Sequence, residues 1–237
     1  MIVLVVPDRE AYDDGIEEVG QHLMGKRKPP QKIKKIDLVK FTKDPKGIRQ
    51  MSQVCHLDFV SKELISTCDL IVYPMGSFFG SILANLLPVG VGRSVYRSQK
   101  PKIYVPNTGR DAEMHGYTLS ECIQCIIRMV QDDVLRELKE EEEDSEEPSN
   151  SVRDQPVIHP RDIVNYVLVD TENCNYCVPV DKEKIEALGI VVMDLPLVST
   201  YSELTPTASS GVNSTEKVKS ATIDPHKLSE VLITLGS

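Results

Sequence analysis

The sequence predicts an α/β protein with a Rossmann-like, mostly parallel sheet, helices on both faces, and a small antiparallel meander near the N-terminus. Short apolar runs, typical of strands covered on both faces, occur at residues 70–73, 102–105 and 166–169. Segments with apolar residues at helical spacing lie between these runs. Strands that alternate with helices form parallel sheets, because each helix carries the chain back across a face of the sheet.

The first 41 residues show no helical spacing and predict the antiparallel meander. Residues 2–6 are an apolar β-branched run, residues 16–23 are interpreted as a second strand, and residues 32–41 alternate between apolar and polar side chains. A turn at residues 13–15 and a basic, proline-rich loop at residues 26–30 separate them.

The remaining elements follow in order along the chain. Helices are expected at residues 57–65, 82–87, 117–138 and 181–188, with a further strand at 190–193. Gly189 suits the end of its helix, because glycine readily adopts the left-handed conformation found there. Asp224 can cap the last helix, and Pro225 fits a first turn that needs no N–H donor.

We expect one domain over residues 1–237, interrupted by two flexible segments. Residues 137–160 hold a dense acidic run followed by proline, serine and asparagine, which predicts a solvated, disordered insertion. Residues 199–222 are rich in serine and threonine and nearly free of core residues, which predicts a flexible loop.

Composition and charge narrow the function classes. The chain has 237 residues, of which 41% are hydrophobic, enough for one sizeable core. Its net charge of −9 disfavours nonspecific nucleic-acid binding, since acidic surfaces repel phosphate backbones. No apolar run reaches membrane-spanning length, and the run at residues 2–6 lacks the features of a signal peptide. These observations predict a cytoplasmic protein with neither membrane nor nucleic acid as partner.

The strand at 70–73 leads into a glycine- and serine-rich loop and then a helix. Gly76 would let the backbone approach a phosphate closely, and the hydroxyls of Ser77 and Ser81 could donate hydrogen bonds to it. The alternative is a tight turn between strand and helix with no ligand. No Gly-Lys-Ser/Thr follows, so the segment is not a P-loop.

Polar side chains crowd the connection after the strand that ends at Val105. Ligands of open α/β sheets lie at the carboxyl ends of the strands. Here Asn107 could read a base or a sugar, and Arg110 could pair with a phosphate, with Asp111 and Glu113 beside them. The alternative is a hydrophilic loop that ends in a helix cap.

Two Cys-x-x-Cys pairs, at Cys122/Cys125 and Cys174/Cys177, resemble a four-cysteine zinc site. The first pair lies within the apolar spacing of the 117–138 helix, where cysteines are small core residues. We therefore expect no zinc.

Several spaced segments together resemble the 2-phospho-L-lactate transferase (CofD-like) superfamily. Residues 68–87 resemble the segment A-D-x-I-x-x-G-P-G-S-x-x-T-S-I-x-P-N-L-L. Residues 102–107 and 113–118 resemble K-x-Y-V-x-N and G-E-T-x-G-Y-T, and residues 224–228 fit a D-P-x-K-L helix start. The order is collinear over roughly residues 55–237 apart from the two flexible segments.

The resemblance implies a site for a nucleotide or a nucleotide-sugar. Asp111 and Glu113 are then candidates to hold Mg²⁺ or to accept the proton of an attacking hydroxyl. The residues expected to bind nucleotide or phosphate are Gly76, Ser77, Ser81, Asn85, Asn107 and Arg110.

Three functions follow from the resemblance. The first is a transferase that moves a phospholactyl group from a nucleoside-diphosphate donor to an acceptor hydroxyl. The second is a non-catalytic regulator of carbon metabolism and cell-wall growth, resembling the gluconeogenesis-factor (YvcK-like) branch, which binds a UDP-sugar. The third is an inactive, truncated member. The Tyr-Pro-Met-Gly-Ser loop and the Gly-Val-Gly-Arg at residues 90–93 most resemble an uncharacterised branch. The sequence does not distinguish which nucleotide base is bound, which acceptor is used, or whether the chain forms a homodimer.

The sequence also departs from the superfamily pattern. Pro74 and Met75 stand where Gly and Pro are usual, Gly80 stands in place of Thr, and Ala84 in place of Pro. The superfamily's opening strand and its Gly-Gly-x-Thr-Gly loop have no counterpart here. We therefore expect a chain that starts partway through the fold and lacks part of the ligand pocket.

Overall fold

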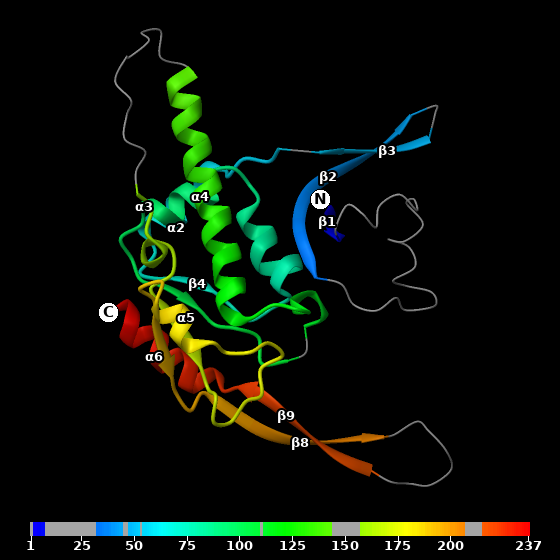
Figure 1. Ribbon diagram of the computed structural model, residues 1–237, viewed down its shortest axis with the longest axis vertical. Helices are drawn as coiled ribbons and strands as arrows, with labels where there is room; N and C mark the ends of the chain where they lie inside the picture. Colours follow the sequence, from blue (N-terminus) through cyan, green and yellow to red (C-terminus); the bar gives the residue numbers. More distant parts are fainter. Residues whose placement is uncertain are drawn as a thin grey trace.

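The computed structural model describes residues 2–7, 32–44, 47–52, 54–109, 111–143, 157–206 and 215–237. Four parallel strands form its central sheet (Figure 1). They are β4 (Ile71–Tyr73), β5 (Lys102–Tyr104), β6 (Tyr166–Val169) and β7 (Val191–Asp194), in the order β4-β5-β6-β7. The predicted parallel sheet is confirmed, with each strand within a residue or two of its expected position.

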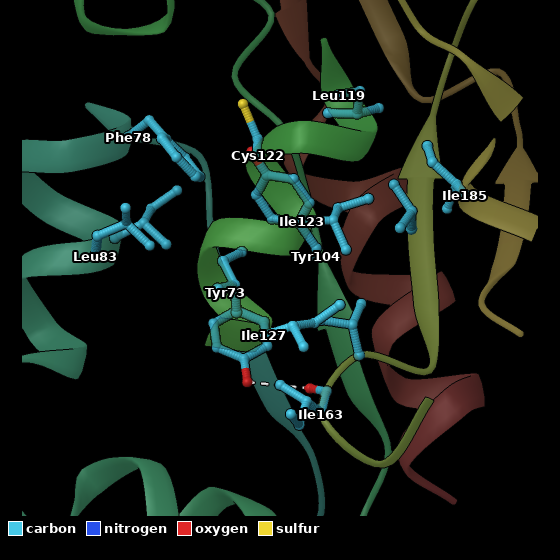
Figure 2. Packing of buried hydrophobic residues seen from close by; sticks show 14 of the residues in the cluster. Tyr73, Phe78, Leu83, Tyr104, Leu119, Cys122, Ile123, Ile127, Ile163 and Ile185 are labelled. Atoms are coloured by element: carbon cyan, nitrogen blue, oxygen red, sulfur yellow. Dashed lines mark hydrogen bonds between the residues drawn. The ribbon is translucent and has the colours of Figure 1, made fainter. Parts of the chain in front are cut away.

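Helices cover both faces of this sheet. Successive side chains of a strand point to opposite faces of the sheet. The strands therefore contribute to two hydrophobic clusters, one on each face. On one face, Tyr73, Tyr104 and Val167 pack against α4 (Leu119–Glu143), as Figure 2 shows for Tyr73, Tyr104 and Ile123. On the other face, Ile103 and Leu168 pack against α6 (Pro225–Gly236).

Short helical elements complete the parallel-sheet half. They are α2 (Phe59–Thr67), the π-helical turn η2 (Phe78–Ile82), the 3₁₀ turn η3 (Leu83–Leu86), α3 (Val91–Arg97), the 3₁₀ turns η4 (Ala112–Met114) and η5 (Pro160–Asp162), and α5 (Lys182–Glu186). The helix expected at residues 82–87 is therefore an irregular pair of turns that begins at Phe78. Helix α3 was not predicted, because its seven residues are too few to display a period.

The expected stop and start signals act as predicted at two helices. Gly189 has a φ of +77° just after α5. The Asp224 carboxylate accepts hydrogen bonds from the backbone N–H groups of His226 and Lys227, and Pro225 occupies the first turn of α6.

The N-terminal antiparallel sheet is confirmed, with a different third strand. It contains β1 (Ile2–Pro7), β2 (Ile33–Asp44) and β3 (Gly47–Ser52), paired in the order β1-β2-β3. The third member follows β2 directly. The strand predicted at residues 16–23 lies outside the described residues.

The segment predicted as a loop at residues 199–222 instead contains a hairpin. Strands β8 (Val198–Pro206) and β9 (Thr215–Ile223) pair antiparallel and extend away from the parallel sheet (Figure 1). Threonine, valine and tyrosine favour strands, a preference that a reading based on loop composition misses. Val198 and Ile223 are buried at the base, where they join the cluster under α6.

The acidic segment is also partly regular. Helix α4 continues to Glu143, into the range assigned to the flexible insertion, because glutamate and lysine are good helix formers. Residues 144–156 lie outside the described residues. Across the part of the chain that the structure describes, no helix is both long and apolar enough to cross a membrane.

Candidate functional site

The loops that follow β4 and β5 meet at the carboxyl edge of the parallel sheet. The Asp111 carboxylate accepts a hydrogen bond from the backbone N–H of Phe78 at 2.8 Å. One Glu113 oxygen accepts from the N–H groups of Phe79 and Gly80, both at 2.8 Å. The two loops that the sequence singled out therefore form one surface.

In this geometry Asp111 and Glu113 cap the first turn of η2. Backbone N–H groups at the start of a helical segment have no partner within it, so carboxylates stabilise them. The second Asp111 oxygen accepts from the Glu113 N–H at 3.0 Å, so both oxygens of Asp111 are engaged. Sequence reasoning assigned these residues to metal or proton chemistry and missed the capping role, which depends on contacts across more than 30 residues of sequence.

The donor set at this edge does not by itself fit a resident metal ion. Magnesium prefers several oxygen ligands in octahedral geometry. Within the described ranges, no group of three or more His, Cys, Asp or Glu side chains is arranged to hold a metal ion. Magnesium brought in with a phosphate ligand stays a prediction.

Gly80 makes room for the Glu113 carboxylate. A Cβ atom at this position would lie 3.1 Å from Glu113 Oε1 and 3.3 Å from Ser77 Oγ, which is tighter than ordinary contact. The glycine that replaces the usual threonine therefore fits the capped arrangement. A Cβ atom added to Gly76 would lie 3.5 Å from Ser81 Cβ, so Gly76 and Ser81 lie against each other.

The other predicted binding residues bond locally. The Asn85 side chain is exposed and donates to the Ser81 carbonyl at 2.8 Å, one helical turn back. The Asn107 side-chain oxygen accepts from the Gly109 N–H at 3.0 Å and closes the turn after β5. Arg110 lies outside the described residues. Of the predicted residues, Ser77 and Ser81 flank Phe78, Phe79 and Gly80, whose N–H groups bind the acidic pair.

A third loop, after β6, packs beside the second. Cys174 Sγ lies 3.9 Å from the Thr108 carbonyl oxygen, and Cys177 Sγ lies 3.8 Å from Met114 Sδ. The loop starts at Asp170, which is buried and accepts a hydrogen bond from the Val198 N–H at 2.8 Å. The sequence signal that could have identified this loop is an acidic residue, Asp170, directly after a buried strand.

The cysteines differ in exposure. Cys122 is buried within α4, and burial raises the pKa of its thiol above the usual range; burial also raises the pKa of Cys125 and Cys174. Cys177 is exposed. A buried thiol with a raised pKa is a poor nucleophile at neutral pH, because the thiolate is the reactive form.

We expect iodoacetamide at pH 7 to modify Cys177 faster than Cys122, Cys125 or Cys174, as measured by peptide mass spectrometry over time. Cys177→Ser should remove the fast phase and leave the rest unchanged. Modification of Cys122 in the native protein at the rate of Cys177 would contradict the packing of α4.

A mostly parallel sheet with helices on both faces and joined polar loops at its carboxyl edge places the chain in the class of open α/β proteins. Residues 46–198 match the family described as 2-phospho-L-lactate transferase CofD, and the chain belongs to this family.

Relatives support the same placement. A gluconeogenesis factor from Halalkalibacterium halodurans is 32% identical over 127 residues, which cover 53% of this chain and 36% of that protein. Two crystal structures of protein BH3568 from Bacillus halodurans, described in one of them as a member of the UPF0052 family, give TM-scores of 0.54 and 0.53 at 21% identity. Each covers 86% of this chain, and the chain spans 51% of the length of each. At this identity the likeness shows the fold alone.

Proposed function

We propose that the chain binds a nucleotide or nucleotide-sugar at the carboxyl edge of β4 and β5 and acts as a regulator of the gluconeogenesis-factor type. The joining of the two loops through Asp111 and Glu113 carries this proposal, because it builds one polar surface where ligands of such sheets bind. The name of the relative from Halalkalibacterium halodurans supports the regulatory role.

A ligand with a diphosphate suits the chemistry of this edge. The N–H groups of Phe78, Phe79 and Gly80 already hold anionic oxygen atoms, those of the protein's own carboxylates. Phosphate oxygens would compete for the same donors and for the Ser77 and Ser81 hydroxyls. Binding would then move Glu113 away from Gly80, and such a ligand-linked change is what a sensor needs.

The same contacts favour a regulator over a transferase. Transfer of a phosphorus group needs cations or donors aimed at the charge that develops at phosphorus. Here the donors hold carboxylates, and both Asp111 oxygens are engaged, so Asp111 is not poised as a base. Ligand recognition without turnover makes no such demand.

Phospholactyl transfer is the second candidate, favoured by the description of the matched family. In that case the acceptor hydroxyl would attack phosphorus and release a nucleoside monophosphate. The carboxylates of Asp111 or Glu113 would have to leave the N–H groups to accept the hydroxyl proton.

Thermal melts with GDP, GTP, UDP and UDP-N-acetylglucosamine, each with and without Mg²⁺, test the proposal. One ligand at 100 times its Kd should add about 2.7 kcal/mol, which at this chain length raises the melting temperature by roughly 5–10 °C. The shift should shrink in a Ser77→Ala, Asn107→Ala variant and persist in Ser66→Ala, a control on the exposed face of α2.

Turnover separates the two candidates. Tight binding of a nucleotide-sugar without product favours the regulator, whereas release of a nucleoside monophosphate from a phosphodiester donor favours the transferase. A cooperative melt that none of the ligands moves would refute both and leave the inactive member.

A further inference from the structure

Lys32, which directly precedes β2, reaches across to the body of the protein. Its ammonium group lies 3.0 Å from both carboxylate oxygens of Glu121 and 4.1 Å from the centroid of the Tyr117 ring. Its methylene groups lie against Gly116, where an added Cβ would be 3.7 Å from Lys32 Cβ and Cδ. Neither the motifs nor the family resemblance drew attention to this residue.

Contacts lead from Lys32 to the candidate site. The Tyr117 ring packs against Phe79 with centroids 5.6 Å apart, and both side chains are buried. The backbone N–H of Phe79 is one of the two that Glu113 holds. Lys32 therefore lies one side chain away from the turn that carries the candidate anion donors.

Glu121 fixes the other end of the contact. One of its oxygens accepts from the Thr118 N–H at 2.9 Å, which closes the first turn of α4. The hydrogen bond from Lys32 is the largest of the causes that lower the pKa of Glu121, so this carboxylate is ionised at neutral pH. Lys32 thus contacts residues 116–121 in three ways: it forms an ion pair with Glu121 and a cation–π contact with Tyr117, and it packs its methylene groups against Gly116.

The antiparallel sheet lies against the same turns. Strand β1 contacts η2, and strand β2 contacts η3. Lys32 stands where this sheet meets the loop after β5, so its ion pair adds to the contacts between the sheet and the turns.

We propose that Lys32 is a positioning residue of the candidate ligand site. It holds Tyr117 against Phe79 and so keeps the η2 turn in the conformation that presents the N–H groups of Phe79 and Gly80. The importance of this for ligand affinity rests on the function proposed above, whereas its effect on the turn does not.

Matched variants isolate the charge. Lys32→Met keeps the aliphatic packing on Gly116 and loses the ammonium group, while Lys32→Arg keeps a cation that can bond Glu121 in a bidentate manner and stack on Tyr117. Lys62→Met, at an exposed lysine of α2, controls for the loss of one positive charge.

The rate of amide hydrogen exchange at Phe79 and Gly80 reports whether the η2 turn keeps its conformation, and the measurement needs no ligand. We expect Lys32→Met to speed this exchange by about three- to tenfold, the size expected for one part-exposed ion pair with a cation–π contact. Lys32→Arg should restore the slow exchange, and Lys62→Met should match the original protein. Unchanged exchange in Lys32→Met would overturn the proposal.

Ligand affinity supplies the second readout. If a nucleotide binds the original protein, Lys32→Met should weaken its Kd by a similar factor and Lys32→Arg should not. Equal affinity in Lys32→Met would overturn the positioning role, with the proposed function intact. If no ligand binds the original protein, the proposed function fails, and the exchange measurement still decides the role of Lys32.

Discussion

Replacing Gly92 with alanine should lower the free energy of unfolding by about 1–3 kcal/mol, the cost of an extra carbon in a closely packed contact. A Cβ atom at Gly92 would lie 2.9 Å from Asp133 Cβ, 3.0 Å from Val130 Cα and 3.1 Å from the Val130 carbonyl oxygen. Two of these atoms belong to the backbone of α4 and cannot rotate away. Helices α3 and α4 would have to separate.

Separation would disturb the polar contacts that hold α3. Asp133 is buried and accepts hydrogen bonds from the N–H groups of Gly90 and Arg93, so it caps α3 from the neighbouring helix. Glu137, one turn on, pairs with Arg93 at 3.0 Å and with Arg97 at 2.9 Å. Glycine at position 92 is what allows this approach.

Urea denaturation measures the effect, with Gly109→Ala as the matched control. Gly109 is exposed, and its nearest neighbour to an added Cβ would be Asn107 Oδ1 at 3.5 Å, an ordinary contact. The control should change stability by no more than about 0.5 kcal/mol. Equal stability of the two variants would show that α4 yields at this contact without cost.

Local signals explain the parts of the fold that the sequence predicted correctly. The buried strands are short apolar runs, and Asp224 and Gly189 act on the ends of the helices next to them. In each case the residues that determine the structure lie within the same short segment of sequence. The carboxyl-edge loops were located for the same reason, since they follow recognisable strands.

Features that depend on tertiary contacts were not predicted. The capping of η2 by Asp111 and Glu113, the capping of α3 by Asp133 and the reach of Lys32 to Glu121 all join residues more than 30 positions apart. Residue type alone assigned Asp111 and Glu113 to metal or proton chemistry. The β8–β9 hairpin was missed because its strand-forming threonines stand among serines typical of loops.

Replacing Asp170 with alanine should destabilise the protein by about 3 kcal/mol, because the buried Val198 N–H and the N–H groups of Asn173 would lose a charged acceptor. Asp170 is 1% exposed and follows β6. Its carboxylate accepts from the Val198 N–H at 2.8 Å and from the Asn173 N–H and side-chain amide at 3.0 and 2.9 Å. It therefore ties the β6 loop to the start of β8.

Urea denaturation and hydrogen exchange at Val198 measure this loss together. Glu172→Ala, an exposed acid two residues along, should stay within about 0.5 kcal/mol of the original protein. Asp170→Asn should fall between them, since its amide keeps one acceptor oxygen but places N–H donors where the carboxylate had a second.

Asp170 stands at the carboxyl edge of the sheet, where a binding role is the competing interpretation. A structural role requires that stability and Val198 protection fall together, with ligand affinity lost only as far as the protein unfolds. An Asp170→Ala protein of undiminished stability would contradict this role. Weakened nucleotide binding in that protein would assign the carboxylate to the ligand site, although it is buried and its hydrogen bonds are made within the chain.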